Sequence, residues 1–593
     1  MDLDGFCEEV VQVKGQRPER QARKPSDKTS IEEPTGLILL FASIMIALVA
    51  SLVWITYSAR TSSSPDPDRE VARAGNEPRE ARNRAKKEKS ILKRDESNAS
   101  QHESPSGREP LPQELLDALL DNSFRFRDIV VRFSSDESLR DFAAKAGERG
   151  LSIEKDLARL GLLRVRLDSG RQARELFELL PEDSEPEPNF PVLVPELPET
   201  ENVRGIASFG RGATAWLDAP EDRSSWGAGV VVAVLDTGVD FSHPSLAGIQ
   251  GTSIDLVEGE APDDSYFGHG TAVASIIAGD PDAVGGLAPK AEILSFRVLD
   301  GEGVGNAYVV ANGIVQAVDR GADVINLSLG SSGHSFAMEK AIGYAVENNV
   351  LVVASVGNDG QKGVTFPARF DGVIGVTAVD KKGSQAIFAN YGDGVDIAAP
   401  GAGVHAAWAE DQLVSFSGTS ASTPFVTGAL AGLISQNRAM PKAQLVELLY
   451  QHANDDPMPG VDPYVGKGIL DLGRVLGREE KGIYDMAITG YYFDPKYFDR
   501  PGSTPFLVSV QNQGTEWVDR ATLEINFGEV SKTLHFSNLG VGEVKSIELQ
   551  LEEKHAKDPD GTRIRSSLVI DSHPDGDMNN NLRITRITLP VDD

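Results

Sequence analysis

Near-continuous apolar runs alternate with helical patterns between residues 205 and 478. The runs are apolar enough for strands that are buried on both faces, which is typical of a parallel sheet. They cover residues 230–235, 293–299, 324–329, 350–354 and 373–379, and the main helical patterns cover 306–320, 335–348 and 441–452. We therefore predict a parallel α/β sheet with helices on both faces for residues 205–478.

The segments on either side of this region have different patterns. Residues 113–200 contain strand patterns at 128–133 and 161–167 and helix patterns at 136–149 and 171–180, which predict a small α+β domain. Residues 483–593 alternate polar and apolar positions in short runs, which predict an all-β sandwich. The runs cover 485–491, 505–510, 521–527, 546–551 and 564–570.

Residues 36–57 contain no charged side chain and end in an aromatic pair, Trp54 and Tyr57. A run of this length spans a bilayer, and the Lys/Arg bias of the flanks favours a cytoplasmic segment at 1–35. We expect a single-pass anchor in the cell membrane with the bulk of the chain outside. A cleaved signal peptide is the alternative, but the preceding region is long and partly acidic. Residues 58–112 are rich in Ser, Pro and charged residues and are expected to form a disordered tether.

Composition narrows the classes of partner. The 593-residue chain holds one cysteine, Cys7, so it cannot form an internal disulfide. The charges of residues 1–36 and 60–109 cancel, and the net charge of −31 therefore lies in residues 110–593. The strong negative charge of residues 110–593 argues against nucleic acid as a partner.

Four polar residues are candidates for chemistry, and two of them follow apolar runs, at the edge where active sites of parallel sheets lie. Asp236 comes directly after the first run and Asn358 follows the run at 350–354, while His269 stands between two glycines at a helix start. Ser420 precedes an apolar helical pattern, so it is expected near a helix N-terminus, with Pro424 in the first turn. An aspartic protease would need a second Asp-Thr-Gly or Asp-Ser-Gly, and none follows a comparable strand. The order Asp, His, Ser is that of the subtilisin type.

Several motifs in the same order resemble the subtilase family of serine peptidases. They are Val-Leu-Asp236-Thr-Gly-Val-Asp-Phe-Ser-His-Pro, Gly-His269-Gly-Thr, Asn-Leu-Ser-Leu-Gly330, Gly-Asn358-Asp-Gly, Ala-Ala-Pro400-Gly and Gly-Thr-Ser420. The resemblance implies that Asp236 orients His269, that His269 takes the proton of Ser420, and that Asn358 helps to form the oxyanion hole. It also implies that two segments pair with the substrate backbone and that Thr365 lies at the floor of the site for the side chain before the cleaved bond. These segments are Gly303, Val304 and Gly305, and Ser328, Leu329 and Gly330.

The resemblance also bears on cofactors and on the flanking domains. No cofactor is required for the chemistry. Ser245 replaces an aspartate that binds calcium in many relatives, and the segment 279–289 is shorter than their calcium loop, so a structural calcium ion is not supported at that site and any metal site is unknown. Residues 125–195 are similar to the ferredoxin-like propeptide of the family, and residues 483–593 resemble the CARDB type of sandwich. Asp571, Asp575 and Asp577 are better explained as a polar turn than as a calcium site.

We therefore predict a serine endopeptidase that is made as a membrane-tethered zymogen. Its expected partners are a protein or peptide substrate, its own propeptide as an intramolecular inhibitor, and the membrane through one helix. A cut between about Phe190 and Gly212 would release the peptidase from the anchor. The alternative is a catalytically silent scaffold whose sandwich binds a cell-surface partner.

Overall fold

The structure is a computed structural model that describes residues 9–12, 128–195, 206–257, 268–455, 458–493, 503–552 and 561–588. The expected anchor at 36–57 and the tether at 58–112 lie outside these residues. Among the helices within the described ranges, none combines the length and the apolar character needed to cross a membrane.

A seven-stranded parallel sheet forms the centre of residues 206–478, as the apolar runs predict. Its strand order is β14-β13-β12-β11-β7-β9-β8. The strands are β7 (Val231–Asp236), β8 (Gly251–Asp255), β9 (Glu292–Arg297), β11 (Val324–Leu327), β12 (Leu351–Ser355), β13 (Val373–Val379) and β14 (Ile397–Pro400). The edge strand β8 was not predicted, because its side chains are mostly exposed and form no apolar run.

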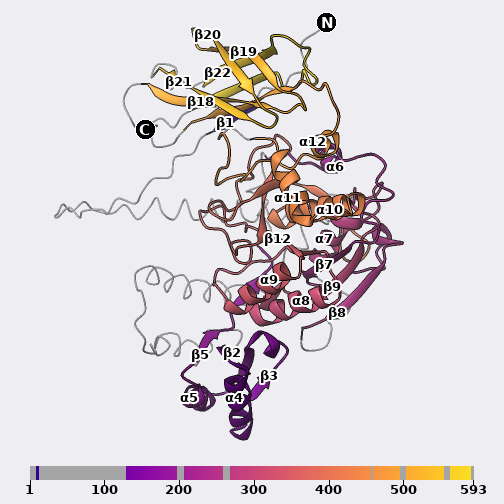
Figure 1. Cartoon of the computed structure of the whole chain (residues 1–593), viewed down its shortest axis with the longest axis vertical. Coiled ribbons are helices and arrows are strands. Elements are labelled where there is room, and N and C mark those ends of the chain that lie inside the picture. Colours follow the sequence, from indigo (N-terminus) through magenta and orange to yellow (C-terminus); the bar gives the residue numbers. More distant parts are fainter. Residues whose placement is uncertain are drawn as a thin grey trace, which may run out of the picture. The chain divides into compact units, whose positions relative to one another are not determined.

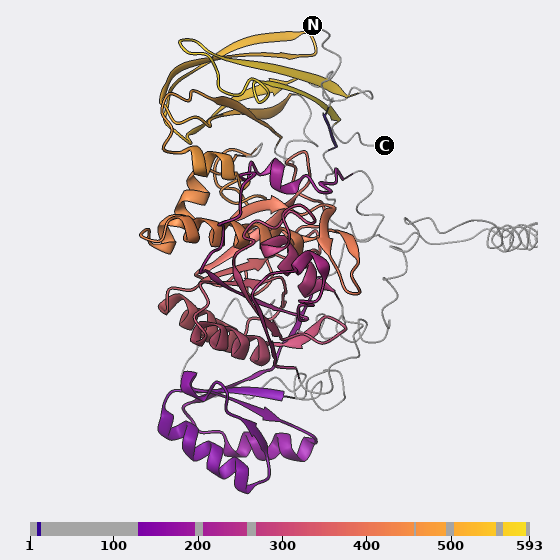
Figure 2. The same cartoon turned by 90° about the vertical axis from the view of Figure 1, so that its right-hand side faces the viewer.

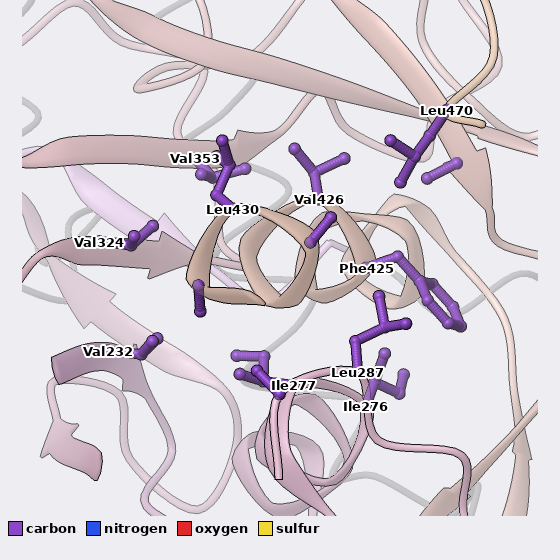
Figure 3. Close-up of a cluster of buried hydrophobic side chains, with 14 of the residues drawn as sticks. Val232, Ile276, Ile277, Leu287, Val324, Val353, Phe425, Val426, Leu430 and Leu470 are labelled. Carbon is purple, nitrogen blue, oxygen red and sulfur yellow. The ribbon is translucent and has the colours of Figure 1, made fainter. Parts of the chain in front are cut away.

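Helices cover both faces of this sheet (Figure 1). The helices α7 (His269–Ala278) and α10 (Thr419–Gln436) pack together on one face, and α8 (Ala307–Asp319) and α9 (Phe336–Glu347) pack together on the other. Successive residues of a strand point to opposite faces, so Val232 joins one core and Ala233 the other. Figure 3 shows the first core, in which Phe425, Val426 and Leu430 of α10 meet side chains of the strands and of α7.

Shorter elements complete this region. They are α6 (Ala213–Trp216), the 3₁₀ turn η4 (Pro244–Leu246), β10 (Val304–Asn306), the antiparallel pair β15 (Val404–Ala407) and β16 (Leu413–Phe416), α11 (Lys442–Gln451) and α12 (Leu472–Gly477). Two polar side chains cap the helices of the second face: Asn306 Oδ1 accepts from Val309 N–H at the start of α8, and Ser335 Oγ accepts from Met338 N–H at the start of α9.

Residues 128–193 form a separate small α+β module. Its elements are β2 (Asp128–Phe133), α4 (Asp136–Glu148), β3 (Ser152–Glu154), η3 (Ala158–Leu160), β4 (Leu162–Arg166), α5 (Gly170–Leu179), β5 (Ser184–Pro188) and β6 (Pro191–Leu193). The first four strands pair antiparallel in the order β3-β4-β2-β5, which is the ferredoxin-like βαββαβ arrangement. Figure 2 shows both helices on the same side of this sheet.

The C-terminal region is all-β, as predicted. Two sheets, β1-β23-β22-β19-β20 and β17-β18-β21, share one apolar core. The strands are β17 (Met486–Tyr492), β18 (Thr504–Asn512), β19 (Val518–Phe527), β20 (Val530–Leu539), β21 (Val544–Leu551), β22 (Thr562–Ile570) and β23 (Leu582–Thr588). The N-terminal strand β1 (Glu9–Gln12) pairs in parallel with β23. The sequence pattern missed β20, in which most side chains are exposed, and β23.

Candidate active site

Asp236 is the last residue of β7 and its side chain is fully buried. Its Oδ1 accepts a hydrogen bond from the Thr237 N–H at 2.7 Å. The chain then turns at Gly238, whose φ of 103° suits glycine. A Cβ atom on Gly270 would lie 2.2 Å from the Gly238 carbonyl oxygen. Glycine at position 270 therefore lets the first turn of α7 approach the end of β7.

That close approach brings His269, the first residue of α7, to Asp236. The Nδ1 atom of His269 lies 2.8 Å from Oδ1 and 3.0 Å from Oδ2 of the carboxylate. Both side chains are fully buried, and the ring of Phe416 meets the imidazole edge-on with 5.3 Å between centroids. A carboxylate only accepts hydrogen bonds, so Nδ1 is the donor in this contact, and in the neutral imidazole this leaves the lone pair on Nε2.

Ser420 is the second residue of α10, where backbone N–H groups lack partners within the helix. Two contacts join it to Ser328: the Ser420 hydroxyl donates to the Ser328 carbonyl at 3.4 Å, and the Ser328 hydroxyl donates to the Ser420 carbonyl at 3.1 Å. The prediction that Pro424 stands in the first helical turn is wrong, because it is the sixth residue of α10. Since proline has no N–H for the carbonyl four residues earlier, the Ser328 hydroxyl serves the Ser420 carbonyl instead.

Asn358 lies beside the start of α10. Its Oδ1 accepts hydrogen bonds from the Thr419 N–H and from the Thr419 hydroxyl, both at 2.9 Å. Because Oδ1 faces these donors, the amide orientation is set and Nδ2 is the donor end. A Cβ atom on Gly418 would lie 2.8 Å from this Nδ2, and Gly418 has a φ of 134°. Position 418 therefore requires glycine, both because its φ is positive and because a side chain there would collide with Asn358.

Both segments expected to bind substrate backbone already pair with β6 of the N-terminal module. Gly305 is the partner of Val192 in an antiparallel pair, and Val194 donates its N–H to the Gly303 carbonyl at 2.9 Å. On the other side, Leu193 and Gly330 exchange two N–H···O bonds of 2.8 Å each. Val304 pairs with Leu193 itself. Three residues of the expected set remain. Ser328 and Leu329 precede Gly330 in the chain, and Thr365 lies beside Gly330.

Thr365 faces the two glycines that follow strands β11 and β12. A Cβ atom on Gly330 would lie 2.8 Å from Thr365 Oγ1, and one on Gly357 would lie 3.0 Å from its Cγ2. The hydroxyl of Thr365 also lies within 3.5 Å of the Ser355 carbonyl oxygen. The threonine side chain therefore occupies space between the two segments.

Sequence reasoning included Asn326 in the motif that ends at Gly330 but gave it no role, although it is a fully buried residue of β11. Its Nδ2 donates to the Ser328 hydroxyl at 3.0 Å, and its Oδ1 accepts from the Thr427 hydroxyl at 2.9 Å. These bonds link β11 to α10 behind Ser420. The sequence does contain a sign of this role, which is an asparagine inside the apolar run Val-Ile-Asn-Leu. An amide that is buried there needs hydrogen-bond partners.

No group of three or more His, Cys, Asp or Glu side chains within the described ranges is arranged to hold a metal ion. The buried polar side chains of the site, from Asp236 to Ser420, instead contact one another and the backbone. The carboxylate of Asp236 and the imidazole of His269 form a contact pair at the end of β7, and the hydroxyl of Ser420 and the amide of Asn358 lie at the start of α10. These are the groups that acyl transfer uses.

Comparison with known proteins agrees with this chemistry. Residues 227–468 match the model of the subtilase family. Thermitase from Thermoactinomyces vulgaris is 38% identical over 253 residues, which are 42% of this chain and 89% of that protein. Subtilisin Savinase from Lederbergia lenta is 39% identical over 229 residues, 38% of this chain and 84% of that protein. Among solved structures, the protease domain of PatA is 31% identical and covers 43% of this chain and 96% of its own, with a TM-score of 0.40. The chain therefore belongs to the subtilase family and is a subtilisin-like serine protease.

Proposed function

We propose that Asp236, His269 and Ser420 form the catalytic triad of a serine endopeptidase and that Asn358 supplies its oxyanion donor. The observation that carries this proposal is the buried contact of 2.8 Å between His269 Nδ1 and Asp236 Oδ1. A serine hydroxyl is a poor nucleophile until a base removes its proton, and a buried carboxylate holds the imidazole in the tautomer that can do so.

The reaction proceeds in two stages. The Ser420 oxygen attacks the carbonyl carbon of the substrate while its proton moves to Nε2 of His269. Asn358 Nδ2 and the Ser420 N–H donate to the oxyanion, next to the positive end of the α10 dipole. The imidazolium then gives its proton to the leaving amine, and water hydrolyses the acyl-enzyme by the reverse roles. Asp236 stabilises the imidazolium throughout.

The test compares two serines on the same helix. Ser420→Ala in the full chain should abolish peptide hydrolysis and labelling by a serine-directed phosphonate. Ser422→Ala is the matched control, because the Ser422 hydroxyl bonds the Ala399 carbonyl and should leave activity in place. Undiminished hydrolysis by the Ser420→Ala protein would refute the assignment. Asn358→Ala should lower kcat by about 10² to 10³, the loss seen for the corresponding donor in a subtilisin.

The N-terminal module is proposed to act as an intramolecular inhibitor, which makes the protein a zymogen. Besides the pairing of β6, the module contacts the starts of two helices. Glu187 accepts from the Ser335 hydroxyl at 2.9 Å and from the Phe336 N–H at 3.1 Å, at the start of α9. Asn189 accepts from the Tyr308 N–H at 3.0 Å, at the start of α8. These contacts and β6 together favour a module that covers the substrate strands until it is cut away.

The zymogen proposal is tested by mapping N-termini with mass spectrometry after expression of residues 110–593. A new N-terminus between about 190 and 212 that depends on Ser420 is the expected result. A mature protein that always retains residues 128–193 would contradict it.

A membrane tether at residues 36–57 with a cytoplasmic N-terminus remains a proposal, and cleavage would release the peptidase from it. In that topology residues 9–12 and the sandwich lie on opposite sides of the bilayer, so the pair of β1 and β23 cannot exist in the tethered form. The test is to find out which forms of the protein stay with washed membranes. Finding all mature protein that contains Ser420 still joined to residues 36–57 would refute release, and finding full-length Ser420→Ala protein outside the membrane fraction would refute the tether.

A further inference from the structure

The register of β6 identifies the residue of this chain that lies opposite the proposed nucleophile. Leu193 and Gly330 form a hydrogen-bonded antiparallel pair, with N–H···O bonds of 2.8 Å in both directions. Hydrogen-bonded pairs in an antiparallel ladder recur every second residue along each strand. Continuing the register by two residues places Pro195 opposite Ser328.

Ser328 is the residue that contacts Ser420. Its carbonyl oxygen lies 3.4 Å from the Ser420 hydroxyl, and its own hydroxyl donates to the Ser420 carbonyl at 3.1 Å. By this register, the residue opposite Ser328 is the one that the segment brings nearest to Ser420. On the other side of β6, the bond from the Val194 N–H to the Gly303 carbonyl holds the segment in the same register.

Proline cannot complete this ladder. The next bond in the series would run from the N–H of residue 195 to the Ser328 carbonyl, and proline has no N–H. The Ser328 carbonyl then receives no backbone bond from the segment and stays in contact with the Ser420 hydroxyl. Proline also restricts the residue before it to extended backbone, which suits the pairing of Val194. The segment is thus well held up to residue 194 and poorly held at the residue to be attacked.

We propose that Pro195 marks the processing bond of this chain and makes its cleavage slow, so that the N-terminal module stays in place as an inhibitor for longer before it is cut away. This inference depends on the proposed triad and on the inhibitory role of the module. In the cut, the bond between the Pro195 carbonyl carbon and the following nitrogen breaks as the Ser420 oxygen bonds that carbon. The Ser420 proton passes through His269 to the leaving amine, and water then releases the carboxylate of Pro195.

The test follows self-cleavage of the full chain and of its Pro195→Ala variant over time. Restoring the N–H should speed Ser420-dependent cleavage roughly fivefold to tenfold, which corresponds to one net hydrogen bond. Mass spectrometry should show a new N-terminus directly after residue 195. Pro198→Ala is the matched control, since it removes a neighbouring proline and should leave the rate as it is.

The outcomes separate this inference from the proposed function. Ser420-dependent cleavage at a different bond, or equal rates for the chain and the Pro195→Ala variant, would overturn the role of Pro195 and leave the triad standing. If neither protein cuts itself or an external peptide, and Ser420→Ala changes nothing, the proposed function fails as well. Thermal unfolding of each variant in the Ser420→Ala background shows whether the module still folds and docks.

Discussion

Glu187 should make the docking of the N-terminal module depend on pH. Its carboxylate is buried at the start of α9, and this burial raises its pKa from the ordinary 4.5 to about 8, although bonds from the Phe336 N–H and the Ser335 hydroxyl act in the opposite direction. The charged group that faces it is Arg132, whose attraction also lowers the pKa. When the module leaves α9, Glu187 becomes exposed and returns to its ordinary pKa.

The sign follows from proton linkage. The docked state has the higher pKa, so docking is strongest below pH 4.5 and weakens as the pH rises towards 8. At about 1.4 kcal/mol for each pH unit, the loss between pH 4.5 and pH 8 is at most about 5 kcal/mol. We expect a smaller effect, because the N-terminus of α9 favours a negative charge, but at least about a tenfold change in the open fraction.

The assay is the rate at which a serine-directed phosphonate labels Ser420 in the uncut chain between pH 5 and pH 9. In the proposed zymogen, labelling needs the module to open, but the reaction at Ser420 also has a pH dependence of its own. The Glu187→Gln variant keeps the size of the side chain and cannot ionise, so the ratio of the two rates cancels the other pH effects. The labelling rate of the unsubstituted chain divided by that of the Glu187→Gln variant should rise with pH up to about pH 8. A ratio that is flat or falls with pH would refute the linkage.

Three further substitutions test the site. Thr365→Gly should raise kcat/KM about tenfold for peptides with Phe rather than Ala before the cleaved bond, because the threonine fills space between Gly330 and Gly357; equal gains for both peptides would contradict this placement. Gly270→Ala should lower kcat/KM by about 10² or more, measured on folded protein, because its Cβ would lie 2.2 Å from a backbone oxygen beside Asp236. Asn326→Leu in the Ser420→Ala background should destabilise the protein by about 1–3 kcal/mol in urea unfolding, since it removes two buried side-chain hydrogen bonds that link β11 to α10; an unchanged midpoint would mean that the network is not needed.

Elements with strong local patterns can be predicted from the sequence. The strands at 128–133 and 373–379 have the predicted bounds, because long runs of apolar side chains identify buried strands. The strands β8 and β20 escape prediction because most of their side chains are exposed and form no apolar run, while backbone pairing places them in their sheets. The local pattern of polar and apolar residues contains no information about a partner strand that is distant in the sequence.

In the candidate site, the sequence indicates which residues to consider, but the structure is needed to show their contacts. Glycine motifs and chain order single out Asp236, His269, Asn358 and Ser420 as candidates in the sequence. The links between them come from tertiary structure, because the contact of Ser328 with Ser420 joins residues 92 positions apart. The position of Pro424 within α10 is accounted for only by the bond from the Ser328 hydroxyl to the Ser420 carbonyl.

The sequence by itself determined the chemical groups, their order and the elements that carry them, since these depend on residue type and local periodicity. Tertiary structure alone decided the neighbours of β6, which lies between β10 and Gly330. An extended segment has no internal hydrogen bonds, so its place depends on whichever backbone it pairs with. That pairing sets the register, and continuing the register by two residues brings a proline opposite Ser328.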